Sequence, residues 1–203
     1  MARKPGPPAE DRRNQILEAA LKVFAEKGFK GATNQAIADE AGISPGLIYR
    51  YFKNKEDLLF ALIENRVGPG SVPVPIEHMH AFPPEQVLPM LAHYGLSRLD
   101  NQDTANLFKL FLGEAAFSDH IRAIANTHLN RLIDPLTRYL AGQMEQGRLR
   151  REDSLLCAQT FLAGLMATLI RRRLLGDSKM LSYSVDEIVH TVVGIFLRGM
   201  RPD

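Results

Sequence analysis

The sequence has little of what marks secreted, metal-binding or membrane proteins. Its 203 residues include a single Cys and no Trp. Cys157 alone can form neither an intramolecular disulfide nor a cysteine-based zinc site, which favours a reducing compartment. Residues 1–8 are polar and proline-rich where a signal peptide needs an apolar run, and charge or Gly interrupts the apolar stretches well before about 20 residues. These absences predict a soluble, cytoplasmic protein without a transmembrane helix.

The chain also lacks a strong excess of charge of either sign. Lys and Arg number 25 and Asp and Glu 23, for a net charge of +2. The whole excess lies in residues 1–66, which hold 11 basic and 9 acidic residues, whereas residues 67–203 hold 14 of each. So small an excess permits nucleic-acid binding without requiring it. Because 45% of the residues are apolar, a disordered chain is excluded.

What the sequence does have is helical periodicity. Apolar residues at 16, 17, 20, 21 and 24 form one stripe of an amphipathic helix, which Gly28 is expected to end. Strict alternation of apolar and polar residues, the mark of a strand, is scarce. Further helices are expected near 55–66, 84–100, 103–115, 118–146, 153–175 and 185–199. With the two short helices described below, the pattern predicts an all-α protein of about nine helices.

Residues 68–75 hold three prolines and two glycines, which excludes a helix there. We therefore predict two domains, residues 1–66 with a flexible tail over 1–9, and residues 67–203.

Residues 33–52 match a helix-turn-helix. Thr33 is a good N-cap for one short helix, and Gly42 supplies the positive φ that ends it. Ser44 is placed to cap a second helix with Pro45 at its first position. Two short helices joined by a turn at Gly form this motif.

The second helix is expected to turn Tyr49, Arg50 and Tyr51 outward, with Lys53 and Lys55 just downstream. Tyrosines are commonly half-buried core residues with exposed hydroxyls. Combined with the cap, the turn and the lysines, they favour contact with DNA, because hydroxyls and lysines around a helix N-terminus suit docking against phosphates.

Residues 12–66 resemble the N-terminal domain of the tetracycline-repressor (TetR) family of bacterial transcriptional regulators. The matching positions are Ile16, Leu17, Ala19, Ala20, Phe24, Gly28, Thr33, Ile37, Ala38, Ala41, Gly42, Ile43, Ser44, Gly46, Ile48, Tyr49, Tyr51, Phe52, Lys55 and Leu58. The resemblance implies a homodimer with a helical, ligand-binding C-terminal domain whose last two helices form the dimer bundle. It implies no enzyme activity and no cofactor.

The resemblance also implies a set of DNA contacts. Tyr49, Tyr51 and Lys55 fall where family members hold phosphates, and Gln35 falls where some members read a base. Residues 45–47 depart from the family, since they offer only van der Waals contact where polar readers are common. The expected DNA-binding residues are Thr33, Gln35, Ser44, Pro45, Gly46, Leu47, Tyr49, Arg50, Tyr51 and Lys55.

The helix over 155–170 is apolar around most of its circumference, so it is either a central core helix or a subunit interface. A second apolar helix follows it, which favours the interface. The candidate interface residues are Leu162, Leu165, Leu169, Ile188, Val192 and Phe196.

Aromatic and Met side chains at helical spacing in the middle region are usually core, yet between helices they also line pockets, as the resemblance implies here. The candidate effector-binding residues are Met90, His93, Phe108, Phe111, Glu114, Phe117 and His128. Because they include no dense cluster of one charge, the expected effector is small and largely apolar.

These expectations describe a ligand-responsive regulator, in this family most often a repressor, that binds a palindromic operator as a homodimer and is released by its effector. The alternative is a DNA-binding regulator or architectural protein without an effector, whose C-terminal domain only dimerises.

Other chemistry finds little support. Residues 42–46 match the G-x-S-x-G elbow of serine hydrolases, but that motif needs a preceding strand where a helix is expected. His78 and His80 lack nearby further metal ligands. The three arginines at 171–173 either bind an anionic ligand or, as we favour, interact with the partial negative charge at the C-terminus of a helix.

Overall fold

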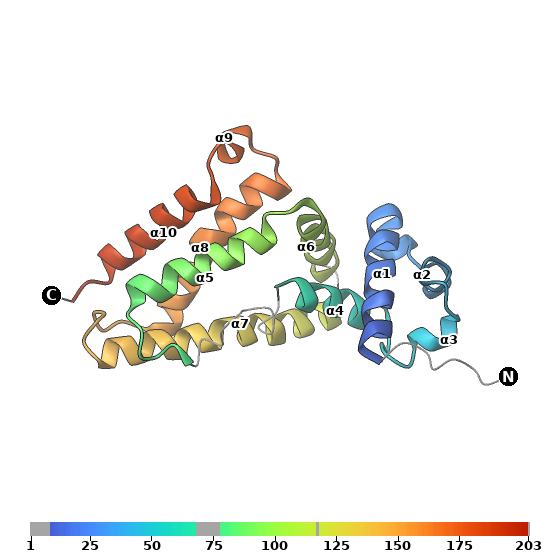
Figure 1. The fold of residues 1–203 in the computed structure, drawn as a ribbon, viewed down its shortest axis with the longest axis horizontal. Helices are drawn as coiled ribbons and strands as arrows, with labels where there is room; N and C mark the ends of the chain where they lie inside the picture. The colour runs from blue at the N-terminus through green and yellow to red at the C-terminus, as the bar shows by residue number, and fades with distance from the viewer. Residues whose placement is uncertain (1–8, 68–77, 117, 203) are drawn as a thin grey trace.

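The computed structural model describes residues 9–67, 78–116 and 118–202, and every regular element in these ranges is a helix. The N-terminal helices lie at one end of the molecule and the last helix at the other, with α4 and α6 between them and α7 running along one side (Figure 1). The elements are α1 (Ala9–Gly31), α2 (Asn34–Ala41), α3 (Pro45–Ile48), α4 (Lys55–Val67), α5 (Pro84–Leu99), α6 (Gln102–Ala115), α7 (Asp119–Glu145), α8 (Ser154–Leu169), the π-helical η3 (Ile170–Leu174), α9 (Ser178–Leu181) and α10 (Val185–Gly199).

The all-α class is confirmed, but the expected count of about nine helices is wrong, because the described residues form eleven helical segments. The two additional segments are η3 and α9. The helix expected over 153–175 changes to π-helical geometry at Ile170 and becomes η3. The single turn of α9 is held by Asp177, whose carboxylate accepts from the N–H groups of Lys179 and Met180. Four residues are too few to show an apolar period, so sequence patterning missed this turn.

Two hydrophobic cores lie within the chain. The N-terminal core joins the inner faces of α1 to α4, and it also includes Leu107 and Phe111 of α6 and Ile121 of α7. The Phe111 ring meets Phe60 of α4 edge to face, with 5.3 Å between the ring centroids. Residues of α6 and α7 therefore complete the core of the N-terminal helices. The linker over 68–75 and residues 1–8 of the tail predicted over 1–9 lie outside the described residues, whereas Ala9 already belongs to α1.

The C-terminal core is formed mainly by α5, α7, α8 and α10. Tyr139 of α7 is fully buried there, and its hydroxyl donates to the carbonyl of Phe82 at 3.0 Å. Phe161 and Phe196 join α8 to α10 through an edge contact of 5.2 Å between centroids.

The buried guanidinium of Arg172 closes one end of this core. Arg172 is 7% exposed, and its Nη2 lies 2.9 Å from Oδ2 of Asp100, the residue that follows α5. Arg173 donates to the same carboxylate at 2.7 Å, and Arg172 also reaches the carbonyls of Met180 and Tyr183. The sequence predicts that the three arginines interact with the partial negative charge at a helix C-terminus. Instead, two of them join η3 to the α5–α6 junction.

Candidate DNA-binding surface and ligand-binding region

The predicted cap and turn of the helix-turn-helix are confirmed. Thr33 Oγ1 accepts from the N–H of Ala36 at 3.1 Å and starts α2. Gly42 ends α2 with a φ of 62°, a left-handed conformation that glycine adopts without a Cβ penalty. Its N–H donates to the carbonyl of Asp39, and the N–H of Ile43 donates to Ala38. Since a helix and a turn precede Ser44, the strand that a hydrolase elbow requires is not there.

Side chains of α1 bind the end of α2 and fix the position of the helix-turn-helix. Gln15 Nε2 donates to the carbonyl of Ala41 at 2.6 Å, at the point where α2 ends. Lys22 on α1 pairs with Glu40 at 2.8 Å, and this hydrogen bond raises the pKa of the Lys22 ammonium. Gln15 and Lys22 lie on the same face of α1, two turns apart, and both bind the last residues of α2, so α1 and α2 form one unit.

The outer face of the motif differs in detail from the expectation. Helix α3 ends at Ile48, so Tyr49, Arg50 and Tyr51 belong to the turn after it. Tyr49 is 61% exposed and Arg50 is also exposed, whereas Tyr51 is half-buried and packs against the core. Ser44 occupies the N-cap position, but its hydroxyl makes no capping hydrogen bond.

The residues expected to offer van der Waals contact sit at the start of α3. Pro45 occupies its first turn and is half-buried, as is Leu47, while Gly46 is exposed. Gln35 is exposed on α2, where its Nε2 donates to Oδ1 of Asp39 at 2.8 Å. A base contact by Gln35 would have to replace this internal hydrogen bond.

Lys55 has a structural role that the sequence did not reveal. Its ammonium donates to the carbonyls of Phe29 and Ala32, both at 2.8 Å, and lies 4.8 Å from the centroid of the Phe29 ring. It thereby joins the start of α4 to the end of α1, beyond the kink at Gly28, and to the connection with α2. The carbonyls precede Lys55 by 26 and 23 residues, so no local pattern could have pointed to them. These two carbonyls take two of the three protons of the ammonium.

The candidate effector residues are divided between two places. Phe108, Phe111 and Glu114 lie on α6, where the rings of Phe108 and Phe111 are 6.4 Å apart and Phe111 belongs to the N-terminal core. Met90 and His93 are exposed on α5, and His93 Nε2 lies 3.0 Å from Asp186 at the start of α10.

The positions of two further effector candidates, Phe117 and His128, are not tested by the described side chains. Phe117 lies outside the described residues, and His128 lies on α7 without a described side chain.

Half of the candidate interface residues are buried within their own chain. Leu165, Leu169 and Ile188 are at most 7% exposed in the C-terminal core. Leu162, Val192 and Phe196 are half-buried and pack against the same core.

The exposed apolar surface of α8 and α10 is formed by other residues. On α8, Leu156 is 65% exposed and shares a stripe with exposed Ala163 and Ala167; on α10, Ile195 is 60% exposed. The two helices pack closely, since a Cβ on Gly164 would lie 3.2 Å from Val192. We call Leu156, Ala163, Ala167 and Ile195 the open apolar face. Predicting it required knowing which side of each helix the core covers.

The same helix corrects one expectation about apolar stretches. Ser154–Leu174 is long and apolar enough to cross a membrane by length and composition, with a mean hydropathy of 1.4, and only 22% of the stretch is buried within the chain. One such helix is weak evidence for a membrane span, because helices of soluble proteins pass the same test. Its exposure shows instead that the chain leaves much of this apolar surface uncovered.

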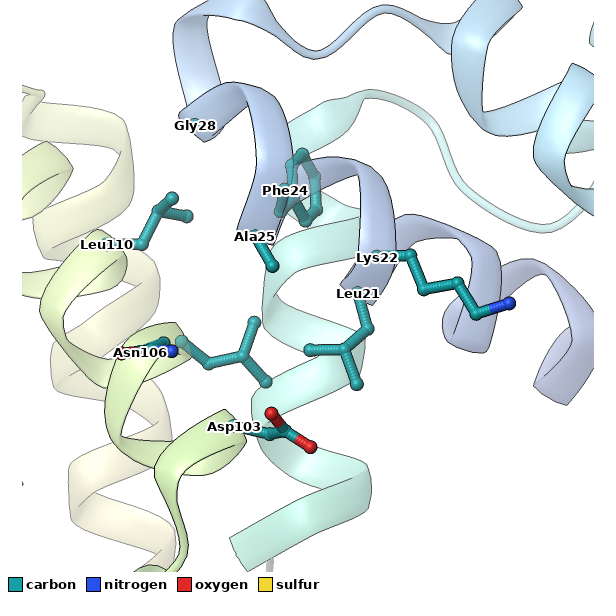
Figure 2. Close-up of a pocket in the computed structure, with 9 residues that line it drawn as sticks. Leu21, Lys22, Phe24, Ala25, Gly28, Asp103, Asn106 and Leu110 are labelled. Carbon is teal, nitrogen blue, oxygen red and sulfur yellow. The ribbon is translucent and has the colours of Figure 1, made fainter.

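A cavity of about 430 Å³ lies between α1 and α6 (Figure 2). Its lining from α1 and α6 consists of Leu21, Lys22, Phe24, Ala25, Gly28, Asp103, Asn106, Leu107 and Leu110. Residues some 80 positions apart form it, so the sequence held no signal for it. Among the described residues, no group of three or more His, Cys, Asp or Glu side chains could hold a metal ion.

Comparison with known proteins agrees with this geometry. Residues 16–62 match the family model of bacterial regulatory proteins of the tetR family, and residues 86–200 match that of the C-terminal domain of AefR-like transcriptional repressors. The regulator HbdR of Aromatoleum sp. (strain CIB) is 50% identical over 56 residues, which are 28% of this chain and 24% of HbdR. The chain thus matches only about a quarter of the length of that relative.

Two similarities extend over nearly the whole chain. The uncharacterized regulator YvkB of Bacillus subtilis (strain 168) is 26% identical over 195 residues, 93% of this chain and 97% of YvkB. The structure of FadR from Bacillus subtilis in complex with stearoyl-CoA aligns with a TM-score of 0.76 at 23% identity, over 93% of this chain and 99% of FadR. Since the C-terminal model alone covers more than half of the residues, the chain belongs to the tetR family of helix-turn-helix, DNA-binding transcriptional regulators.

Proposed function

We propose that this protein is a repressor that binds a palindromic DNA operator as a homodimer and that a small, largely apolar effector releases it. The observation that carries the proposal is the helix-turn-helix itself. Its inner face is fixed to α1 by Gln15 and Lys22, while Tyr49 and Arg50 are exposed on the outer side. A rigid unit with an exposed hydroxyl and guanidinium beside a helix N-terminus is suited to phosphate contact and groove docking.

The homodimer is supported by the open apolar face. Leu156 and Ile195 are more than half exposed on neighbouring helices, and a second copy related by a two-fold axis would cover both. Such a dimer carries two copies of α3. A palindromic operator matches them when they reach successive major grooves, about 34–36 Å apart.

The effector is proposed to bind in the C-terminal domain and to carry an acyl or aromatic body. The aromatic side chains of α6 support an apolar site, and the related FadR structure holds stearoyl-CoA. Release would follow if the ligand favours a dimer geometry in which the two motifs no longer match successive grooves. The chain then acts by binding instead of catalysis, in the cytoplasm, as a member of a family of DNA-binding regulators.

The experiment begins by selecting DNA from a random pool with the full-length protein, and then measures binding by fluorescence anisotropy. The variant Tyr49→Ala/Arg50→Ala should lose at least tenfold in affinity for the selected DNA. Arg151→Ala removes the same guanidinium charge from an exposed site between α7 and α8 and should bind like the wild type. Equal losses in both would contradict the assignment of the DNA-binding surface.

Stearoyl-CoA is then added to the complex with selected DNA. Release at micromolar concentration that is weakened by Phe108→Ala supports an acyl effector site near α6. Phe111→Ala is a poorer choice, because Phe111 packs against Phe60 and its loss would disturb the N-terminal core. Binding without any sequence preference would favour the architectural alternative.

A further inference from the structure

The cavity between α1 and α6 lies against the N-terminal core, because Phe24 and Leu107 belong to that core and Leu21 and Leu110 pack against it. Helix α1 carries the helix-turn-helix through Gln15 and Lys22. Helix α6 begins directly after Asp100 and Asn101, which follow α5. Leu107 and Phe111 of α6 pack into this core, while the space beside Leu107 is left unfilled. The volume of about 430 Å³ falls in the range of roughly 300–1,000 Å³ typical of small-molecule sites.

The walls of the cavity favour an apolar body. The side chains of Leu21, Phe24, Ala25, Leu107 and Leu110 form most of the lining. Filling such a space removes apolar surface from water on both the ligand and the protein, which stabilises the complex.

The polar groups at the edge select the head group of the ligand. Figure 2 shows the Asp103 carboxylate at the cavity beside Leu21, whereas the Lys22 side chain extends away from α6. The Lys22 ammonium is held by Glu40 at 2.8 Å. Among the residues that the structure describes, none forms a hydrogen bond or ion pair with Asp103. The charge that faces the cavity is therefore negative.

Asn106 adds a second polar group beside Asp103. Its Oδ1 accepts from Gln102 at 3.0 Å, so its amide N–H groups remain for a ligand oxygen or water. A carboxylate ligand would meet the charge of Asp103 unfavourably, and an ammonium would pair with it.

We propose that the α1–α6 cavity is a binding site for a small organic cation that has an apolar body and one ammonium group. The site is separate from the effector site of the proposed function, because it lies against the N-terminal core, where α6 meets α1, and not among the helices of the C-terminal core. Its ligand contacts both α1 and α6. Binding should therefore affect the position of α1 relative to α6 and, through α1, the position of the helix-turn-helix.

The test uses n-octylammonium, 1-octanol and octanoate, which share an eight-carbon chain and differ in the head group. Binding to the full-length protein is measured by titration calorimetry. Octylammonium should bind at least threefold more tightly than octanol and about tenfold more tightly than octanoate. Asp103→Asn should remove the preference for the cation. Asp119→Asn, which changes a first-turn acid of α7 away from the cavity, should keep it.

A second variant fills the space. Ala25→Phe places a ring at the cavity from an exposed position on α1 and should weaken octylammonium binding at least fivefold. Ala123→Phe introduces the same ring at an exposed position on α7 and should bind like the wild type. Equal binding of the three probes, or binding that neither Asp103→Asn nor Ala25→Phe changes, overturns the inference.

The inference can fail without the proposed function. Wild-type protein that binds selected DNA and responds to stearoyl-CoA, but shows no preference for octylammonium, overturns only the cation site. Conversely, protein that binds octylammonium through Asp103 but selects no DNA sequence overturns only the operator function.

Discussion

The N-terminal and C-terminal cores differ in how completely the chain covers them. The N-terminal core is covered within one chain except at the α1–α6 cavity, since α6 supplies Leu107 and Phe111 to the four helices before the linker. The C-terminal core leaves Leu156 and Ile195 more than half exposed on α8 and α10. The N-terminal region thus exposes hydroxyl and charged groups where DNA contact is proposed, and the C-terminal region exposes apolar groups where a second copy is proposed to bind.

The two regions are alike in one respect, because a long-range cation closes a joint in each. Lys55 binds two carbonyls at the α1–α2 connection, and Arg172 binds Asp100 and two carbonyls near α9. Lys55 serves a surface proposed to contact DNA, whereas Arg172 is almost fully buried. The difference predicts that loss of the buried joint costs more stability.

Replacing Ile195 with Glu should give the largest effect. In the proposed dimer, two uncompensated carboxylates would meet across the two-fold axis, so dimer affinity should fall about a hundredfold or more. Analytical ultracentrifugation measures the change, and the folded monomer should persist because Ile195 is exposed within its own chain. Leu169→Glu would not separate the two effects, since Leu169 is buried in the core.

His190→Glu is the matched control for Ile195→Glu. His190 is exposed on the same helix and lies about 140° around it from Ile195, given about 100° per residue. It should remain dimeric. Dissociation of both variants, or of neither, would place the interface elsewhere.

Asp100→Ala should lower the free energy of unfolding by about 3 kcal/mol, because it leaves the Arg172 guanidinium buried without its carboxylate. Glu152 pairs with Arg150 at the surface, so Glu152→Ala should cost much less. Urea unfolding followed by circular dichroism compares the two variants. Equal losses would show that burial of the Arg172 pair adds nothing.

The same carboxylate predicts a dependence on acid. Burial alone would raise the pKa of Asp100, but the hydrogen bonds from Arg172 and Arg173 outweigh it and hold the pKa below its ordinary value of 3.8. The folded state therefore binds fewer protons, and the stability that Asp100 contributes above about pH 4 is lost as the pH falls through its lowered pKa. Asp100→Asn should reduce the fall in the free energy of unfolding that occurs below about pH 4. An unchanged fall would assign the acid sensitivity to other carboxylates.

Lys55→Ala should lower the free energy of unfolding by about 2 kcal/mol, because two charge-assisted hydrogen bonds to Phe29 and Ala32 disappear. If its third proton meets a phosphate, the magnitude of the salt slope of DNA binding should also fall by about 1. Lys53→Ala removes an exposed charge nearby and should leave stability within about 0.5 kcal/mol. A stability loss with an unchanged slope would make Lys55 a purely structural residue.

Gln35→Ala should have the smallest effect, about 1 kcal/mol of discrimination at one base pair in each half-site. The gain from a base contact is reduced because Gln35 must give up its bond to Asp39. Binding to DNA variants with single substitutions measures it. A uniform loss across all variants would assign Gln35 to positioning instead of base recognition.

Local features of this fold could be predicted because neighbouring residues determine them. The N-cap at Thr33, the left-handed Gly42 and the periodic long helices depend on residues within one or two turns. The family was predictable for the same reason, since its motif is a run of closely spaced residues. The turn of α9 escaped because four residues carry no period.

Contacts between distant segments could not be predicted in this way. The sequence alone determined that the chain is helical and carries a helix-turn-helix. Only the tertiary structure decided that Lys55 closes the α1–α2 connection, that Leu165 is core while Ile195 is surface, and that α1 and α6 form a cavity beside Asp103. Each of these depends on which face of a helix meets a partner far away in the chain, and amphipathic spacing defines a face without naming its partner.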